Sequence, residues 1–199
     1  MSNFKNEKTL VLIKPDGIQR SLIGEIISRF EKIGLKIIGL KLFIPSKKQV
    51  LRQYAPDKKT VELLGEKAVK NQKINQKTKI DYYNEGLKII NYLKNYLICG
   101  PIVAIALQGN QAVEIVKKLV GTTEPLSSDV GTIRGDYTLD SYTIANYNGR
   151  AVRNLIHCSG SPNEAKREIK IWFKKKELCR YNLIQEKILY DVNLDGIRE

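Results

Sequence analysis

The sequence predicts an α/β protein in which short buried strands alternate with amphipathic helices. Three apolar runs predict strands: KTLVLIK at 8–14, LKIIGLKLFIP at 35–45 and GPIVAIALQG at 100–109. The first run stops at the turn signal KPDG, as expected for a buried strand followed by a sharp loop. Between and after these runs, apolar residues recur at helical spacing. The expected order is strand, helix, strand, helices, strand, helix.

The helices are expected where this spacing meets end signals. SLIGEIISRFEKIG at 21–34 has apolar residues on one face, and Gly34 provides a C-terminal stop. NQAVEIVKKLVG at 110–121 repeats the pattern after the third strand. Between these helices, residues 46–98 form a polar, helical stretch with twelve Lys and Arg against five Asp and Glu. Residues 121–153 resemble a long irregular connection, which is more often functional than idle when ordered.

The last clear helix begins within SPNEAKREIKIWF at 161–173. Ser161 is a good N-cap and Pro162 suits the first helical position. Glu164, three residues after the serine, is expected to complete a capping box. The buried stripe of this helix is predicted to contain Ala165, Ile169 and Trp172.

Composition narrows the class of protein. A chain of 199 residues with 42% hydrophobic content fits one large domain with its own core. The first 20 residues have neither the apolar core of a signal peptide nor the length of a membrane span, which predicts a cytoplasmic protein with no membrane partner. Three cysteines without a close pair predict reduced thiols, with neither a disulfide framework nor a zinc site.

The formal net charge of +13 favours an anionic partner such as a nucleic acid, an acidic membrane surface or a nucleotide. The alternative is a Lys-rich, solvated surface without a specific partner. Composition alone leaves both readings open.

The single histidine, His157, lies in NLIHCSGSPNE at 154–164. The phosphate-binding loops GxxxxGKS/T and GxGxxG are absent, and one histidine excludes HExxH zinc sites. An imidazole offers an unprotonated nitrogen at physiological pH as a base or nucleophile. A lone histidine is more often structural, but Ser159, Gly160 and Ser161 supply hydroxyls, backbone amides and a helix start, which favour an anion.

Two cationic residues extend this candidate site. Lys14 begins KPDG at the end of a predicted strand, where a loop can present its ammonium group to a phosphate. Arg134 lies between glycines in GTIRGDY at 131–137, and a guanidinium can bind phosphate oxygens with two parallel hydrogen bonds. Taken singly, KPDG is also a good turn and most loop arginines are simply solvated.

In this order, TLVLIKPDG, the GEII helix, CGPIVAIALQG, GTTEP, GTIRGD and NLIHCSGSPNEAKREIKIWF resemble the nucleoside diphosphate kinase family. The resemblance covers about three quarters of the chain. It implies a ferredoxin-like α/β sandwich: a four-stranded antiparallel sheet with helices on one face. Residues 1–199 are then expected to form a single kinase domain, with a Lys-rich helical insertion at about 46–98.

The resemblance also implies roles for individual residues. His157 would be the phosphorylated nucleophile, oriented by Ser159 and Glu168, with Tyr54 near the transferred phosphate. The phosphate and sugar ligands would be Lys14, Lys117, Thr123, Arg134 and Asn154. Tyr83 and Leu87, in YYNEGL, are the expected base contacts.

The chain departs from the family pattern at several positions. Lys117 stands where the family has an arginine, which removes a bidentate phosphate contact. The stretch DSYTIANYNG at 140–149 is extra, and Cys158 places a thiol beside the nucleophile.

The expected function is transfer of the γ-phosphate of ATP to nucleoside diphosphates, with little base selectivity, by a ping-pong mechanism through His157. Mg²⁺ would be held mainly by the nucleotide phosphates, without protein side chains as ligands, and the enzyme would be a homo-oligomer, a tetramer or hexamer. One alternative is a catalytically weak relative that binds nucleic acid or regulates. Another is a histidine phosphocarrier that passes phosphate to a protein.

Overall fold

The computed structural model describes residues 4–71, 80–193 and 195. It contains a four-stranded sheet in the order β2-β3-β1-β4, in which every pairing is antiparallel. The strands are β1 (Glu7–Ile13), β2 (Lys36–Phe43), β3 (Ile102–Gly109) and β4 (Ile156–Cys158). The three predicted strands lie within one or two residues of their expected ends, and the four-stranded antiparallel sheet is confirmed.

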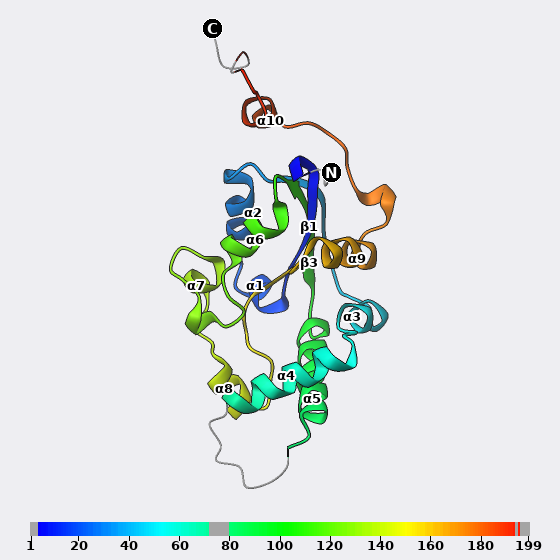
Figure 1. Ribbon diagram of the computed structural model, residues 1–199, viewed down its shortest axis with the longest axis vertical. Coiled ribbons are helices and arrows are strands. Elements are labelled where there is room, and N and C mark those ends of the chain that lie inside the picture. Colours follow the sequence, from blue (N-terminus) through cyan, green and yellow to red (C-terminus); the bar gives the residue numbers. More distant parts are fainter. Residues whose placement is uncertain (1–3, 72–79, 194, 196–199) are drawn as a thin grey trace.

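The described part of the chain contains ten α-helices, of which α2, α6 and α9 lie beside the strands, while α4, α5 and α8 lie together beyond one end of the sheet and α10 beyond the other (Figure 1). They are α1 (Pro15–Gln19), α2 (Ile23–Lys32), α3 (Lys47–Gln53), α4 (Lys58–Asn71), α5 (Tyr82–Ile98), α6 (Ala112–Val120), α7 (Ile133–Tyr137), α8 (Tyr142–Tyr147), α9 (Pro162–Trp172) and α10 (Ile184–Leu189). Short 3-10 turns occupy Phe4–Asn6, Pro125–Ser127 and Lys175–Glu177. The connection at 121–153 is therefore not wholly irregular, because α7 and α8 lie within it.

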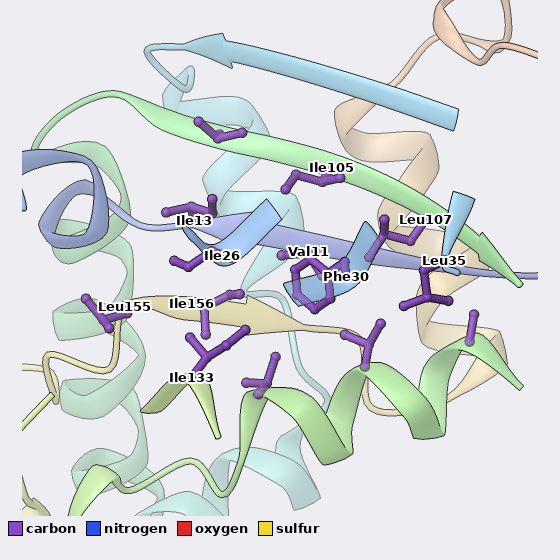
Figure 2. Close-up of a cluster of buried hydrophobic side chains, with 14 residues drawn as sticks. Val11, Ile13, Ile26, Phe30, Leu35, Ile105, Leu107, Ile133, Leu155 and Ile156 are labelled. Carbon is purple, nitrogen blue, oxygen red and sulfur yellow. The ribbon is translucent and has the colours of Figure 1, made fainter. Parts of the chain in front are cut away.

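Helices cover both faces of the sheet, so the expectation of helices on one face is wrong. Val11 and Ile13 of β1 pack with Phe30 of α2 and with α6 in one cluster, which Figure 2 shows. Leu10 and Leu12, which point the other way, pack against α9 and α3 in a second cluster. A strand buried on both sides has no polar face, which is why its sequence is a continuous apolar run. Figure 1 shows α2 and α6 on one side of β1 and α9 on the other.

The predicted helical stretch at 46–98 contains α3, α4 and α5, and its residues 72–79 lie outside the described residues. Helices α4 and α5 pack through two glycines. A Cβ atom on Gly65 would lie 1.8 Å from the carbonyl oxygen of Tyr82, and one on Gly86 would lie 1.9 Å from that of Val61. The backbones therefore approach more closely than any larger residue allows. This contact turns Gly86 inward and leaves Tyr83 and Leu87 exposed.

The start of α9 follows the predicted signals with one difference. Ser161 caps the helix, because its hydroxyl accepts from the backbone N–H of Glu164. The Glu164 carboxylate, however, accepts from the N–H of Gly160 at 2.6 Å instead of from Ser161. The predicted capping box is thus only half formed, and its second bond orders the loop that follows His157.

The C-terminal part of the chain returns to the sheet beyond α9. Lys36 of β2 forms an ion pair of 2.6 Å with Glu186 of α10, and the Tyr181 hydroxyl donates to the carbonyl oxygen of Ile37. None of the helices in the described ranges is both long and apolar enough to cross a membrane.

Candidate active site around His157

His157 lies on the short edge strand β4, where it pairs with Leu12 of β1. The strand is preceded by a tight turn, in which the N–H of Ile156 donates to the carbonyl oxygen of Asn154 at 2.6 Å. Leu155, between them, is fully buried and has a φ of 61°. This left-handed conformation is costly for a leucine and persists only when the surroundings impose it. The turn separates the side chains of Asn154 and His157 from the apolar side chain of Leu155.

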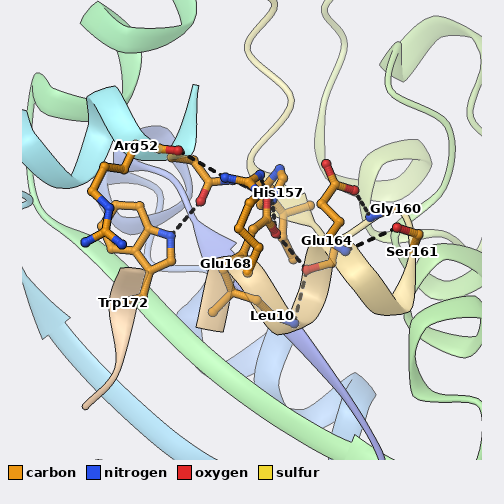
Figure 3. Close-up of polar contacts among 12 residues, drawn as sticks. Leu10, Arg52, His157, Gly160, Ser161, Glu164, Glu168 and Trp172 are labelled. Atoms are coloured by element: carbon orange, nitrogen blue, oxygen red, sulfur yellow. Dashed lines mark hydrogen bonds and ion pairs between the residues drawn. The ribbon is translucent and has the colours of Figure 1, made fainter. Parts of the chain in front are cut away.

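The His157 imidazole is oriented by Glu168 of α9. Its Nε2 atom lies 3.1 Å and 3.0 Å from the two carboxylate oxygens, and the Glu168 side chain is 1% exposed (Figure 3). An ionised carboxylate can only accept, so Nε2 carries the hydrogen. In the neutral ring Nδ1 then keeps its lone pair, which is the requirement for a nucleophile.

The carboxylate of Glu168 is itself held in the ionised form. Burial alone would raise its pKa, but the charge of His157 and hydrogen bonds from His157, Ser159 and Gln53 outweigh burial and lower the pKa below its ordinary value. Ser159 is fully buried, donates to Glu168 at 2.7 Å and accepts from the N–H of Leu10. The structure therefore brings together Ser159, Glu168 and His157, as the resemblance implied.

A second chain of hydrogen bonds reaches Glu168 through Gln53, at the end of α3. The indole N–H of Trp172 donates to Gln53 Oε1 at 2.7 Å, and an indole can only donate. This fixes the orientation of the Gln53 amide, whose nitrogen donates to Glu168 and lies 3.2 Å from His157 Nε2. Sequence reasoning missed Gln53, because a glutamine in a polar helix gives no signal of burial. Its position next to Tyr54, a predicted site residue, was the one available clue.

Lys14 follows β1 directly and is 4% exposed. Its ammonium group donates to Asn154 Oδ1 at 2.6 Å, and the Asn154 amide nitrogen donates to the carbonyl oxygen of Thr123 at 2.7 Å. Burial and the nearby charge of Arg134 lower the pKa of Lys14 to about 7. A bound anion would favour the charged form again, so the side chain is suited to phosphate.

Arg134 is buried and joins three segments of backbone. Its guanidinium donates to the carbonyl oxygens of Gly121, Thr122, Asn154 and Ile156. A guanidinium has five N–H groups, so one remains for a ligand. The fork onto phosphate expected from the sequence is therefore largely used inside the protein, and Arg134 contributes mainly positive charge and the positions of these loops.

A pocket of about 680 Å³ opens in front of these groups. Its lining includes the sequence-predicted Lys14, Tyr54, Lys117, Thr123, Arg134, Asn154 and His157, together with Cys158 and Gly160. Lys117, whose side chain is 42% exposed, also lines the pocket and forms an ion pair with Glu114 at 3.2 Å. Burial, and then the charge of Glu168, raise the pKa of the Tyr54 hydroxyl, so it stays protonated and able to donate. Burial likewise raises the pKa of Cys158 and keeps its thiol protonated.

A second, more apolar pocket of about 330 Å³ adjoins the first. Leu93, Thr123 and Asn154 line both pockets. Its apolar wall consists of Leu64, Ala68, Ile89, Leu93, Ala151 and Val152. Tyr83 lies elsewhere, in a hollow between α4 and α5, and Leu87 lines neither pocket. The structure does not bring Tyr83 and Leu87 to His157. Instead, Ile89 and Leu93, further along α5, line the smaller pocket, and Leu93 also lines the pocket that contains His157.

Within the described residues, no group of three or more His, Cys, Asp or Glu side chains could hold a metal ion. The carboxylates that line the larger pocket are Glu114 and Asp129. A divalent ion would therefore depend on oxygen ligands that a bound anion supplies.

The fold and this site define a phosphate-binding α/β sandwich with an oriented histidine. A family model described as nucleoside diphosphate kinase matches residues 7–63 and 63–178. The nucleoside diphosphate kinase of Pyrobaculum aerophilum is 47% identical over 178 residues, which cover 86% of this chain and 97% of the relative. That of Sulfurisphaera tokodaii is 40% identical, over 86% of this chain and 92% of the relative.

Solved structures agree. The crystal structure of an NDP kinase from Pyrobaculum aerophilum has a TM-score of 0.84 and 45% identity, and the match covers 88% of this chain and all of that one. A transition-state mimic of the Borrelia burgdorferi nucleoside-diphosphate kinase with bound vanadate and ADP has a TM-score of 0.76 and 32% identity, over 94% and 98% of the chains. The chain belongs to the nucleoside diphosphate kinase family. The predicted family, fold class and enzyme class are confirmed.

Proposed function

We propose that this kinase works through a phosphohistidine on Nδ1 of His157. Nδ1 attacks the γ-phosphorus of a nucleoside triphosphate, the bond to the bridging oxygen breaks, and the nucleoside diphosphate leaves with that oxygen. A second nucleoside diphosphate then attacks the phosphorus with a terminal oxygen and regenerates the imidazole. The observation that carries this proposal is the pair of contacts between Nε2 and Glu168, because they leave Nδ1 as the free nucleophile.

The remaining groups neutralise charge and position the phosphates. Lys14 and Arg134 are two buried cations in one pocket, and the partly exposed Lys117 adds a third. Phosphoryl transfer depends mainly on positioning and on such preorganised charge. Tyr54 supplies a protonated hydroxyl at the same pocket, and Asn154 holds Lys14 in place through its amide oxygen.

Mg²⁺ is proposed to arrive with the nucleotide, because the described residues provide no metal-binding cluster of their own. When bound to the phosphates, the ion would neutralise charge that develops during transfer. The pocket has the size and the cationic lining for such a complex.

The nucleoside is proposed to lie in the second pocket. Since Leu93, Thr123 and Asn154 line both pockets, a ligand whose phosphates lie near His157 can place its base against the apolar wall. The volume of about 330 Å³ falls at the lower end of the range for small-molecule sites, roughly 300–1,000 Å³. Ile89, Leu93 and Val152 then replace Tyr83 and Leu87 as base contacts.

The proposal is tested by forming the phosphoenzyme. The protein is incubated with γ-labelled ATP and Mg²⁺, and the label on the chain is examined for acid lability and alkali stability. Because His157 is the only histidine, phosphohistidine identifies the site without mapping. We expect labelling in wild type and none in His157→Asn, with transfer to unlabelled GDP. A folded wild-type protein that takes no label would refute the proposal.

The same experiment separates the alternatives. Label that passes to a protein acceptor but not to diphosphates would indicate a phosphocarrier. If the protein takes no label and its affinity for DNA or RNA falls steeply with salt, the result would support a nucleic-acid-binding function. The net charge of +13 is the observation that suggests this alternative.

We also propose a homo-oligomer of a single cytoplasmic kinase domain. Strand β2 lies at the edge of the sheet, and its side chains Leu40 and Leu42, with the neighbouring Ile44, are 52%, 60% and 74% exposed. An edge strand with exposed apolar residues is a favourable surface for a second copy. Native mass spectrometry of wild type and of Leu42→Lys tests this: a wild-type monomer would contradict it.

A further inference from the structure

The aromatic ring of Tyr96, in the last turn of α5, lies close to two cationic side chains. The Lys14 Nζ atom is 5.0 Å from the ring centroid, and the guanidinium carbon of Arg153 is 4.4 Å from it. Both distances fall within the roughly 6 Å at which the face of an aromatic ring attracts a cation. Tyr96 itself is 4% exposed and lines neither of the two adjoining pockets. It can therefore act on a bound nucleotide only through its neighbours.

Lys14 is a buried cation without a counter-ion. Among the described residues, the one hydrogen-bond acceptor of its ammonium group is the neutral amide oxygen of Asn154, at 2.6 Å, and no carboxylate forms an ion pair with it. A buried ammonium group has lost its hydration and stays charged only where other groups compensate for that loss. Burial, and then the charge of Asp16, raise the pKa of the Tyr96 hydroxyl, so the ring beside Lys14 is uncharged and offers its electron-rich face.

The charge of Lys14 is sensitive to its surroundings near neutral pH. Burial, and then the charge of Arg134 in α7, lower the pKa of the ammonium group to about 7. Asp16 of α1 and Cys158 of β4 raise this pKa, and Arg153 lowers it further. A group with a pKa of about 7 is about half charged at neutral pH. A modest change in one neighbour therefore alters the charged fraction of Lys14 several-fold.

We propose that Tyr96 is a positioning residue of this kinase, whose ring face holds the Lys14 side chain in its charged form for the incoming phosphates. The inference rests on the proposed function, in which Lys14 binds those phosphates. The ring compensates for part of the hydration that Lys14 loses. Because it also attracts Arg153, it offsets part of the repulsion between the two cations. This assigns a role in binding to the end of the helical stretch at 46–98.

The charge of Lys14 can be measured without a nucleotide. Competitive acetylation with a trace of labelled acetic anhydride over a range of pH gives the pKa of each lysine, read by mass spectrometry on its peptide. Lys14 lines the larger pocket, so this small reagent can reach its amine. Tyr96→Leu removes a desolvated aromatic face and should lower the pKa of Lys14 by about one pH unit. Tyr96→Phe keeps the face and removes only the hydroxyl, so it should retain the wild-type value.

Calorimetric titration with ADP and Mg²⁺ gives the second measurement. Phosphate binds the ammonium form in preference to the neutral amine, so the affinity for ADP follows the charged fraction of Lys14. With a pKa about one unit lower, Tyr96→Leu should bind ADP about ninefold more weakly than wild type at pH 8, but only about twofold more weakly at pH 6. A purely structural effect of the substitution would weaken binding by the same factor at both pH values.

Three further variants support the assignment. Tyr82→Leu is the matched control, because it makes the same substitution in the same helix at a side chain that is 43% exposed and lines neither of the two pockets, and it should behave as wild type. Arg153→Met, at an exposed position, removes a charge that lowers the pKa of Lys14, so this pKa should rise. Where circular dichroism shows that Tyr96→Leu does not fold, Tyr96→Met, a flexible side chain without an aromatic face, takes its place.

The outcomes distinguish this inference from the proposed function. An unchanged pKa of Lys14 in Tyr96→Leu, or an equal fall in Tyr96→Leu and Tyr96→Phe, would overturn the role of the ring even if His157 takes and passes on the label. A lower pKa with the same loss of affinity at pH 6 and pH 8 would also overturn it, because Lys14 would then not bind the phosphates through its charge. A lower pKa together with the larger loss at pH 8 would support it even in a protein that forms no phosphoenzyme.

Discussion

The hydrogen bond between Trp172 and Gln53 can be tested by a double-mutant cycle. Both side chains are buried, at 1% and 5% exposure, and the indole N–H has Gln53 Oε1 as its acceptor at 2.7 Å. Gln53→Leu leaves this N–H without a partner, and Trp172→Phe leaves the amide oxygen without its donor. Each orphaned group costs about 1–3 kcal/mol. In the double variant neither group remains.

The cycle should therefore show strong coupling. Gln53→Leu also removes a hydrogen bond to the ionised Glu168, worth about 1.5–3 kcal/mol, so this variant alone should lose about 2.5–6 kcal/mol. That second loss is common to the single and double variants and cancels in the cycle. We expect the double variant to be about 2–6 kcal/mol more stable than the sum of the single variants predicts, because both orphaned groups are absent from it.

The assay is denaturant unfolding of the four proteins, followed by far-ultraviolet circular dichroism because Trp172 is the only tryptophan. Additivity within about 0.5 kcal/mol would refute the coupling.

The pH dependence of the stability tests the role of Glu168. Its pKa is lowered in the folded protein, so its contribution is present above the unfolded pKa and is lost as the pH falls through the folded value. The stability difference between wild type and Gln53→Leu should shrink in acid.

Two further predictions concern Lys14 and the packing of α4 on α5. Because burial beside Arg134 lowers the pKa of Lys14 to about 7, binding of ADP near pH 7.5 should take up protons, and the calorimetric enthalpy should depend on the buffer; an enthalpy that is the same in phosphate and Tris would contradict this. Gly86→Ala should destabilise the protein by about 2–3 kcal/mol, because the new Cβ would lie 1.9 Å from the carbonyl oxygen of Val61. Gly24→Ala, with nothing within 4 Å, is the matched control and should stabilise α2 by about 0.5–1 kcal/mol in thermal unfolding.

The parts of the fold that local patterns determine were predictable from the sequence. β1 and α2 follow from a buried apolar run and from helical spacing, and the capping serine of α9 follows from its type and position. The second covered face was not predicted, because a continuous apolar run reveals burial but not what covers each side. β4, with three residues, is too short to show a period.

The candidate site likewise contains residues that the sequence predicts and residues that it does not. The sequence points to His157 because it is the only histidine and to Lys14 because it begins the turn signal KPDG, and the structure places both in one pocket. Gln53 was missed because its burial depends on Trp172, 119 positions away in the sequence. Tyr83 was chosen because it is aromatic, whereas the orientation of α5 depends on the close approach at Gly86, which hydrophobic spacing does not reveal.

The two adjoining pockets are lined largely by different helices and segments of the chain. The groups around His157 come from the sheet, from α3, α6, α7 and α9 and from the segments that follow β1 and α6, whereas the smaller pocket is lined mainly by α4, α5 and α8 and by the segment at 150–154. With the base placed as proposed, substitutions of α4, α5 and α8 residues that line only the smaller pocket are expected to alter nucleotide affinity more than the chemical step. In a protein built this way, substitutions that change the preferred nucleotide need not reduce the rate of phosphoryl transfer. The smaller pocket can therefore be redesigned while the residues around His157 are left unchanged.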